Sequence, residues 1–185
     1  CDVCVQDAFG TAHRAHASNV GVLDFIPVAS SGFLLDGERT YLSDAIENPV
    51  KPFVVVLGGS KISGKIELIE NMMEYASDII IGGAMAFTFL KAQGFSTGGS
   101  LIDSDRLAIA RELLNKAQSK SISIHLPKDV LASTEISETS GWEISDVDRL
   151  KNDEIGLDIG PESCIEFEQI LANANTILWN GPLGV

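Results

Sequence analysis

The sequence predicts an α/β fold in which a parallel sheet carries helices on both faces, giving three layers. Short apolar runs without polar alternation, such as 53–57 and 79–81, indicate strands that are covered on both faces. Longer stretches with apolar residues three to four positions apart separate these runs and indicate amphipathic helices. The two patterns alternate from residue 53 onward, and such alternation is typical of parallel sheets.

The segment before residue 53 is predicted to contain a strand, a loop and a long helix. The apolar run 3–5 predicts the strand, and the Gly- and His-containing segment 7–18 predicts the loop. Apolar residues recur on one helical face between 31 and 47, which predicts a helix there. The pair Asn48-Pro49 ends that helix, because a residue before proline is disfavoured in the α region.

Local signals also predict the elements of the remaining segment. Strands are expected where apolar, mostly β-branched residues run together, at 53–57, 79–81, 122–126, 129–132 and 176–179. Helices are expected where apolar residues recur at helical spacing, at about 62–76, 84–93, 107–117 and 161–174. Asp103 is the expected N-cap of the third of these helices, and Pro161 suits the first turn of the last. Polar residues 133–154 predict loops and a short hairpin.

Composition excludes several functional classes. The chain has 185 residues, 45% of them hydrophobic, and a net charge of −13, which is the composition of an ordinary globular protein. The acidic excess argues against binding to nucleic acid or to an anionic membrane, although a small anionic ligand would feel only local charge. Three cysteines fit a reducing compartment, and no apolar run approaches the ~18 residues of a membrane span. Because the chain starts without Met, we expect a segment truncated at both ends.

The segment from Leu57 to Lys65 is the richest candidate for a ligand site. Gly58 and Gly59 remove side chains where a strand turns into a helix, so a ligand could approach the backbone and the helix N-terminus could bind phosphate. Lys61 and Lys65, four positions apart, are expected on one face of the first helical turns, where an anion would relieve their repulsion. The alternative is a tight turn with two solvated lysines, and the segment is not a Walker A loop.

A basic cluster in the loop after the first strand is the second candidate. Arg14 can form paired hydrogen bonds to a phosphate or a carboxylate, with His13 and His16 beside it. The alternatives are a loop held by structural hydrogen bonds and a zinc site that also uses Cys1 and Cys4. The zinc site is disfavoured, because those cysteines would point to opposite faces of a strand and the spacing departs from zinc fingers.

Two further glycine-rich turns could frame an apolar slot for a base together with the glycine pairs at 58–59 and 82–83. They are Gly156 to Pro161 and Trp179 to Gly184, with Asn180 as a polar group that could fix a ligand. Asp158 could be a helix N-cap or a metal ligand, and capping is the commoner role of a lone aspartate. No metal site is predicted within the chain.

Five segments together resemble the phosphoglycerate kinase family, in the family's order and over nearly the whole chain: 7–16, 57–65, 81–91, 156–161 and 179–185. The resemblance implies a Rossmann-like, two-lobed kinase that moves a phosphoryl group between 1,3-bisphosphoglycerate and ADP with Mg²⁺. It implies that residues 1–28 end the N-terminal substrate lobe and that 29–51 form a connecting hinge helix. Residues 52–185 would then be an incomplete C-terminal nucleotide lobe.

The resemblance also implies roles for individual residues. Arg14 would grip the phosphoglycerate, with His13 and His16 beside it, and Lys61 would neutralise the transferring phosphoryl group. Lys65 and Asn180 would contact the nucleotide phosphates. The remaining nucleotide-binding positions are Gly59, Ser60, Gly82, Gly83, Gly156, Leu157, Pro182 and Val185.

The sequence departs from the family pattern at three places. Gly64 replaces an Asp that can assist Mg²⁺, Ala84 replaces a third glycine at the adenine wall, and 133–154 matches weakly. The Mg²⁺ ligand is expected outside this segment, and the segment alone is expected to be inactive. The complete protein is expected to be a monomer in the cytoplasm or a plastid. The competing hypothesis is a non-catalytic module of the same fold that binds a nucleotide or an anion.

Overall fold

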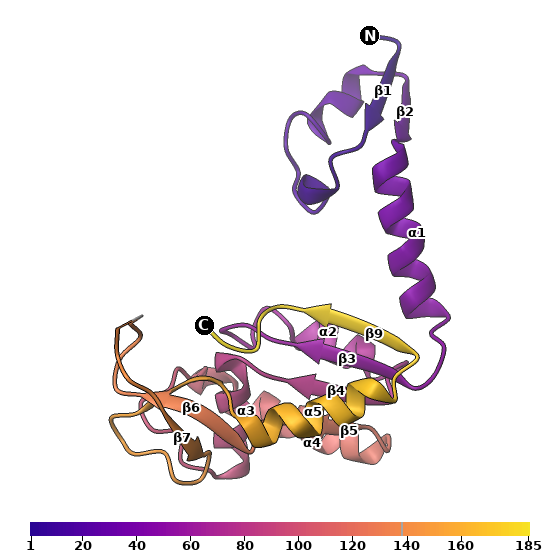
Figure 1. Cartoon of the computed structure of the whole chain (residues 1–185). Coiled ribbons are helices and arrows are strands. Elements are labelled where there is room, and N and C mark those ends of the chain that lie inside the picture. The colour runs from indigo at the N-terminus through magenta and orange to yellow at the C-terminus, as the bar shows by residue number, and fades with distance from the viewer. Residues whose placement is uncertain (138) are drawn as a thin grey trace. The chain divides into compact units, whose positions relative to one another are not determined.

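In the computed structural model, which describes residues 1–137 and 139–185, the chain divides into two units, Cys1–Asn48 and Pro49–Val185. In the first unit, strand β1 (Val3–Gln6) pairs in parallel with β2 (Val28–Ser31). The 3₁₀ turns η1 (Phe9–Thr11) and η2 (Gly21–Phe25) lie between them, and helix α1 (Phe33–Glu47) follows β2 (Figure 1). The predicted strand, loop and helix of this segment are confirmed.

The start of α1 is held by a side chain from the loop after β1. The backbone N–H of Leu35 donates to Asp7 Oδ1 at 2.8 Å, which satisfies a helix N–H that has no partner within the helix. A Cβ at Gly32 would lie 2.2 Å from Asp7 Cγ, so glycine is required where the loop meets the helix. Asp7, at the start of the loop that carries the basic cluster, therefore anchors this loop to the first turn of α1.

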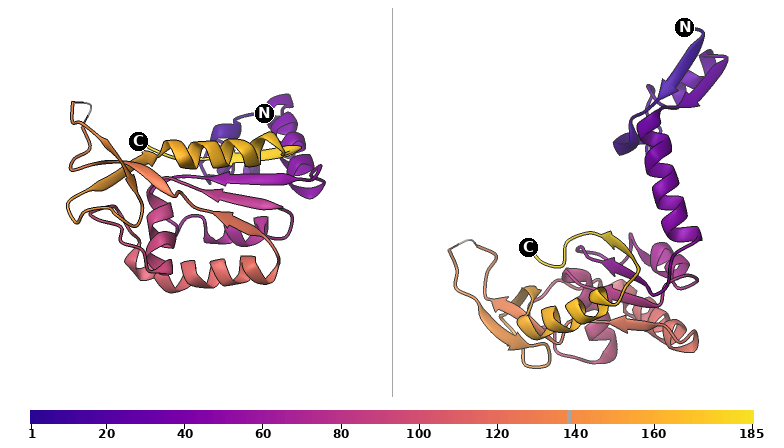
Figure 2. Two further views of the ribbon diagram at one scale, coloured as in Figure 1. Left: turned by 60° about the horizontal axis from the view of Figure 1, so that its bottom comes forward. Right: turned by 45° about the vertical axis from the view of Figure 1, so that its right-hand side comes forward.

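The second unit is built on a parallel sheet with the strand order β5-β4-β3-β9. Helices α2, α3 and α4 lie on one side of this sheet and α5 on the other, as the left view of Figure 2 shows. The strands are β3 (Phe53–Leu57), β4 (Asp78–Ile81), β5 (Ser123–His125) and β9 (Thr176–Asn180). The helices are α2 (Ile66–Met72), α3 (Ala84–Gln93), α4 (Leu107–Ser119) and α5 (Pro161–Ala172).

The core of this unit follows from the apolar strands. Every residue of β3 is buried, as expected for a strand covered on both faces. On one face Val54 and Val56 pack with Phe167 of α5, and Ile80 of β4 joins the same cluster. The predicted three-layer arrangement is confirmed.

A second, antiparallel sheet with the order β7-β6-β8 extends the unit beside the parallel one. It consists of β6 (Asp129–Ser133), β7 (Glu143–Asp146) and β8 (Ile155–Ile159). The expected strand at 129–132 is present, and β7 forms a hairpin with it. The strand expected at 129–132 therefore belongs to this antiparallel sheet and not to the parallel one. Local sequence signals cannot decide which sheet a strand joins.

Three local expectations are wrong. Helix α2 begins at Ile66, so Lys61 and Lys65 precede it instead of sharing a face of its first turns. Asp103 precedes the 3₁₀ turn η3 (Ser104–Arg106), and its side chain makes no capping bond. Asp158 does not cap α5, because that role falls to a residue on another strand.

The residue that caps α5 is Asp129, at the start of β6. Its carboxylate accepts hydrogen bonds from the backbone N–H groups of Glu162 (2.9 Å) and Ser163 (2.7 Å) and from Ser163 Oγ (2.6 Å). Burial raises the pKa of this carboxyl, but the hydrogen bonds outweigh it and hold the pKa below its ordinary value. Asp129 therefore joins the antiparallel sheet to α5.

Within the described residues, no helix is both long enough and apolar enough to cross a membrane.

Candidate functional site

The strands of the parallel sheet end at an apolar cavity of about 440 Å³. One side is formed by the turns that follow β3, β4 and β9, which carry Gly59, Gly83 and Pro182. The other side is formed by β8. The complete lining is Gly59, Ser60, Gly83, Ala84, Leu101, Ile136, Ile155, Gly156, Leu157, Pro182, Gly184 and Val185.

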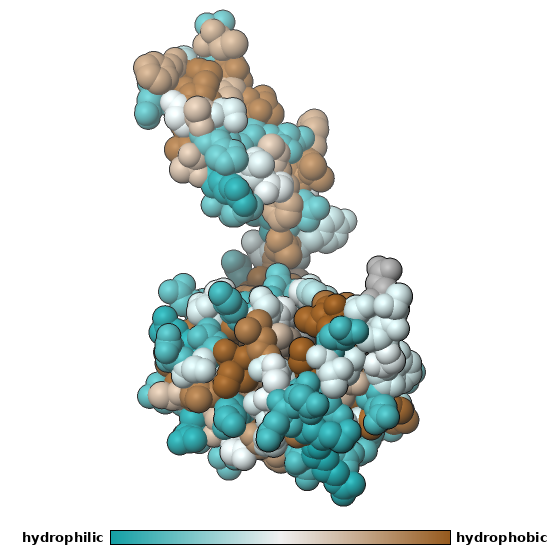
Figure 3. Space-filling model, turned by 90° about the vertical axis from the view of Figure 1, so that its left-hand side faces the viewer, coloured by the Kyte–Doolittle hydropathy of each residue, from teal (hydrophilic) through white to brown (hydrophobic). Residues whose placement is uncertain are grey.

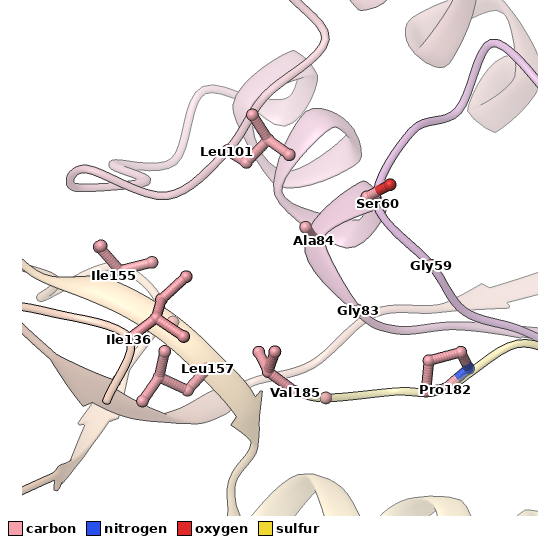
Figure 4. A pocket seen from close by; sticks show the side chains of 12 residues that line it. Gly59, Ser60, Gly83, Ala84, Leu101, Ile136, Ile155, Leu157, Pro182 and Val185 are labelled. Atoms are coloured by element: carbon pink, nitrogen blue, oxygen red, sulfur yellow. The ribbon is translucent and has the colours of Figure 1, made fainter. Parts of the chain in front are cut away.

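The cavity has apolar side chains on opposite sides (Figure 4). Ile136, Ile155 and Leu157 face Ser60, Ala84 and Pro182, and Val185 lies between the two groups. Figure 3, which views the molecule from the side where the strands end, shows hydrophobic surface gathered on this face of the second unit. A flat apolar group such as a base would fit this lining, and the hydroxyl of Ser60 is the side-chain polar group among the lining residues.

The cavity lies at the point where the order in which strands are added to the sheet reverses. From β3 the chain proceeds to β4 and β5 on one side, and it returns through α5 to β9 on the other side of β3. In open parallel sheets, ligands bind outside the carboxyl ends of the strands at such a reversal. The position of the cavity is therefore the one that the topology favours for a ligand.

Glycines allow the three turns to pack together. A Cβ at Gly58 would lie 1.9 Å from the carbonyl oxygen of Pro182, a contact that no side chain can make. Gly83 has a φ of +67°, and a Cβ there would lie 2.7 Å from the backbone nitrogen of Gly59. The glycines were predicted to let a ligand approach the backbone closely. In the structure they let the backbones of the three turns approach one another.

Lys65 joins the ends of β3 and β9. Its Nζ donates to the carbonyl oxygens of Gly58 (2.7 Å) and Asn180 (3.0 Å) and to the side-chain oxygen of Asn180. Burial lowers the pKa of this ammonium from its ordinary value. Three oxygens therefore surround an ammonium that has three N–H groups, so the alternative of two solvated lysines does not hold for Lys65.

Lys61 has a different environment. Its side chain is exposed, and its ammonium makes no hydrogen bond or ion pair with the described parts of the chain. It lines a second cavity of about 420 Å³, which shares Ser60 and Leu101 with the first. Asp103, Asp105 and Arg106 also line this second cavity. Lys61 is thus an exposed cation in a cavity that adjoins the first.

The basic cluster lies in the first unit and is exposed. Arg14 Nε donates to His13 Nε2 at 3.1 Å, and His16 is exposed beside them. Asn19, which is 7% exposed, orders this loop. Its amide nitrogen donates to the carbonyl oxygens of Thr11 (2.9 Å) and Arg14 (2.8 Å), and its amide oxygen accepts from His16 N–H (2.8 Å). Sequence reasoning missed Asn19, because nothing in the local pattern distinguishes it from a solvated asparagine.

The structure brings most of the predicted nucleotide-binding residues together around the first cavity. Those that line it are Gly59, Ser60, Gly83, Gly156, Leu157, Pro182 and Val185. Lys65 and Asn180 lie behind the turns and bind each other, and Gly82 packs against Leu183. The lining residues that the sequence did not single out are Leu101, Ile136 and Ile155, which come from loops and a strand of weak local pattern.

An irregularity in β8 explains why three consecutive residues line the cavity. In a regular strand Ile155 and Leu157 would face one side and Gly156 the other. The pairing of β6 with β8 passes from Leu131 opposite Asp158 to Ala132 opposite Gly156, so Leu157 is the extra residue of a bulge. Bulges redirect side chains near binding sites, and this one turns β8 into a wall of the cavity.

The described residues contain no group of three or more His, Cys, Asp and Glu side chains that could hold a metal ion, and Cys1 and Cys4 are free thiols. Around Gly64 the space is open, since a Cβ there would meet nothing within 4 Å. The first atom of a side chain at this position would therefore meet no other group.

Comparison with known proteins gives one consistent result. The family model described as phosphoglycerate kinase matches residues 1–185. The chain is 46% identical over 184 residues to the phosphoglycerate kinase of Chloroherpeton thalassium and 48% identical over 184 residues to that of Chlorobium phaeovibrioides. Each match covers 100% of this chain and 46% of the relative, so the chain spans about half the length of these relatives.

The fold comparison agrees. The solved structure of phosphoglycerate kinase from Coxiella burnetii matches with a TM-score of 0.90 and 45% sequence identity. The match covers 100% of this chain and 48% of that chain.

Proposed function

The chain belongs to the phosphoglycerate kinase family, and on that premise we propose that it provides the nucleotide site of a phosphotransferase. The reaction moves a phosphoryl group between 1,3-bisphosphoglycerate and ADP, giving 3-phosphoglycerate and ATP. The observation that carries the proposal is the convergence of separate segments on one apolar cavity. Turns after β3, β4 and β9 meet β8 there, at the reversal point of a parallel sheet.

The base of the nucleotide occupies this cavity. Leu157 and Ile155 would contact one face of the base and Ala84 the other, because they lie on opposite sides of the cavity. Gly59 and Gly83 keep the backbone close to the ligand. The phosphates extend toward Lys61, Lys65 and Asn180, and the N-terminus of α3 adds a partial positive charge beside Gly83.

Phosphoryl transfer depends on positioning and charge neutralisation, so cations matter more than nucleophiles. Lys61 is exposed beside the cavity, and it neutralises charge on the transferring group. Arg14, with His13 and His16, binds the anionic phosphoglycerate through its guanidinium group. These two cations lie in different units of the chain.

Mg²⁺ accompanies the nucleotide in this proposal. The described residues offer no cluster of carboxylates to hold it, and Gly64 provides no ligand. The chain therefore contributes cations and backbone N–H groups to the phosphates, while the metal ligand lies elsewhere in the complete enzyme. We further propose that the complete enzyme acts as a monomer in the cytoplasm or in a plastid.

Binding and turnover measurements test the proposal. The 185-residue chain should bind ADP in calorimetry, whereas a coupled assay should detect no turnover of the family's kind by this chain alone. In a protein of family length that carries this sequence, Arg14→Ala should abolish 3-phosphoglycerate binding while ADP binding is retained. ADP binding together with phosphoglycerate binding that ignores Arg14 would favour the non-catalytic module. An absence of ADP binding would overturn the nucleotide site.

A further inference from the structure

The outer edge of β8 is bound by a side chain from the loop between α3 and α4. The backbone N–H of Gly156 donates to Ser100 Oγ at 3.0 Å. Ser100 is 7% exposed and Gly156 is half-buried, so this hydrogen bond is partly shielded from water. Ser100 itself does not line the cavity. Gly156 lines it, and so does Leu101, the residue after Ser100.

Gly156 is also restrained by Phe87, which does not line the cavity. A Cβ at this position would lie 2.1 Å from Cζ of Phe87, which means that the ring of Phe87 packs against the backbone of Gly156. Phe87 is itself buried in α3. The backbone of Gly156 is thus fixed between an aromatic ring and the hydroxyl of Ser100, at the bulge that brings Leu157 to the cavity.

The loop that carries Ser100 is fixed to the segment before β8. Gly99 N–H donates to the carbonyl oxygen of Glu154 at 2.7 Å. Gly98 approaches the same segment so closely that a Cβ there would lie 2.4 Å from the Glu154 oxygen. The loop of Ser100 is therefore fixed to the chain before β8, and the Ser100 hydroxyl joins the loop that carries Leu101 to strand β8.

We propose that Ser100 is a positioning residue for nucleotide binding, which acts by holding Gly156 and Leu157 at the distance from Leu101 that a base requires. This inference rests on the proposed nucleotide site. Without the hydroxyl, the N–H of Gly156 loses its acceptor at a partly shielded position, and β8 can shift toward water to recover one. The cavity then widens, and the contacts of a base with both walls weaken.

The test compares Ser100→Ala with two matched variants in the 185-residue chain. Ser100→Thr keeps a hydroxyl at the same position. Ser96→Ala removes a hydroxyl from the same loop, where Ser96 Oγ donates to the Leu150 carbonyl oxygen at 3.4 Å, away from the cavity. Calorimetry with ADP gives the dissociation constant, hydrogen exchange gives the protection of the Gly156 amide, and thermal unfolding gives stability.

Ser100→Ala should raise the dissociation constant for ADP by roughly fivefold to tenfold and should speed exchange at Gly156 by a similar factor. Ser96→Ala and Ser100→Thr should stay within about twofold of the unsubstituted chain. In a protein of family length, Ser100→Ala should raise KM for the nucleotide and leave kcat within about twofold, as expected for lost uniform binding.

Some results would overturn the proposal. Unchanged ADP affinity in Ser100→Ala, with or without lower thermal stability, would reduce Ser100 to a structural residue. Equal losses in Ser96→Ala and Ser100→Ala would show an effect of the loop as a whole. Should Ser100→Ala fail to fold, weak ADP binding by a folded Ser100→Thr would count against the role. If the unsubstituted chain does not bind ADP, the proposed nucleotide site fails, and the role of Ser100 fails with it.

Discussion

The ammonium of Lys65 binds Asn180, 115 positions further along the chain, through both the carbonyl oxygen and the side-chain oxygen of the asparagine. The third N–H of the ammonium goes to the carbonyl oxygen of Gly58. A phosphate that recruits Lys65 must therefore replace at least one of these bonds. Lys65 thus stabilises the turns after β3 and β9, and under the proposed function its rearrangement would couple their stability to nucleotide binding.

Lys65→Met should lower both stability and ADP affinity. Methionine keeps an unbranched side chain but removes the donors from the oxygens of Gly58 and Asn180. We expect the free energy of unfolding to fall by about 1–2 kcal/mol and the dissociation constant for ADP to rise at least about tenfold. Urea denaturation and calorimetry measure the two effects.

Lys61→Met is the matched control for the stability effect. The Lys61 side chain is exposed, so its replacement should change the free energy of unfolding by less than about 0.5 kcal/mol. Equal stability of the two variants would contradict the structural role of Lys65.

Lys61→Ala should reduce turnover far more than nucleotide affinity. In a protein of family length, kcat should fall at least about 100-fold, because the contact strengthens as charge develops on the transferring group. The dissociation constant for ADP should rise by less than about fivefold. Lys91→Ala, an exposed lysine in the last turn of α3, should leave both quantities unchanged. Parallel losses of kcat and affinity would rule out a selective role in the transition state.

Gly83→Ala should destabilise the turns around the cavity. A methyl group there would lie 2.7 Å and 2.8 Å from the backbone nitrogen and oxygen of Gly59, and the φ of +67° disfavours any L side chain. We expect a loss of at least about 2 kcal/mol in the free energy of unfolding. Gly64→Ala is the control, since nothing lies within 4 Å of its Cβ, and it should cost less than about 0.5 kcal/mol. Equal costs would mean that close packing of the turns is unimportant.

Asp129→Asn should make stability less dependent on acid pH. The Asp129 carboxylate caps α5, and its hydrogen bonds hold its pKa below the ordinary value of 3.8 in the folded protein. As pH falls, the unfolded chain binds the proton first. The stabilisation is therefore complete above pH 3.8 and is lost as pH falls through the folded pKa.

At neutral pH we expect Asp129→Asn to cost about 2 kcal/mol, and the difference from the unsubstituted chain should shrink at lower pH. Urea denaturation from pH 7 to pH 3 measures it. Asp158→Asn tests the rejected cap, since Asp158 accepts a bond from its neighbour Ile159 instead (2.7 Å). A larger or more pH-dependent effect at Asp158 than at Asp129 would reverse the assignment of the cap.

Much of the fold could be predicted because its signals are local. The unbroken apolar run 53–57 indicates a doubly covered strand whatever surrounds it, and α3 was predicted with the bounds that the structure shows, Ala84–Gln93. The start of α2 was misplaced, because the apolar spacing continues through Ile62 while the backbone there forms a turn. Of the antiparallel sheet only the strand at 129–132 and a short hairpin within 133–154 were predicted, because the pairing of β6 with β7 and β8 depends on partner strands and not on local signals.

The sequence by itself determined the strands, the helices and the glycine turns, since periodicity and turn preference belong to consecutive residues. It also carried the motifs that mark the family, in their order. Only the tertiary structure decided which distant groups meet: Lys65 with Asn180, Ser100 with Gly156, and Asp129 with the first turn of α5. These pairs are 115, 56 and 34 positions apart, and such contacts form only when separate elements have packed.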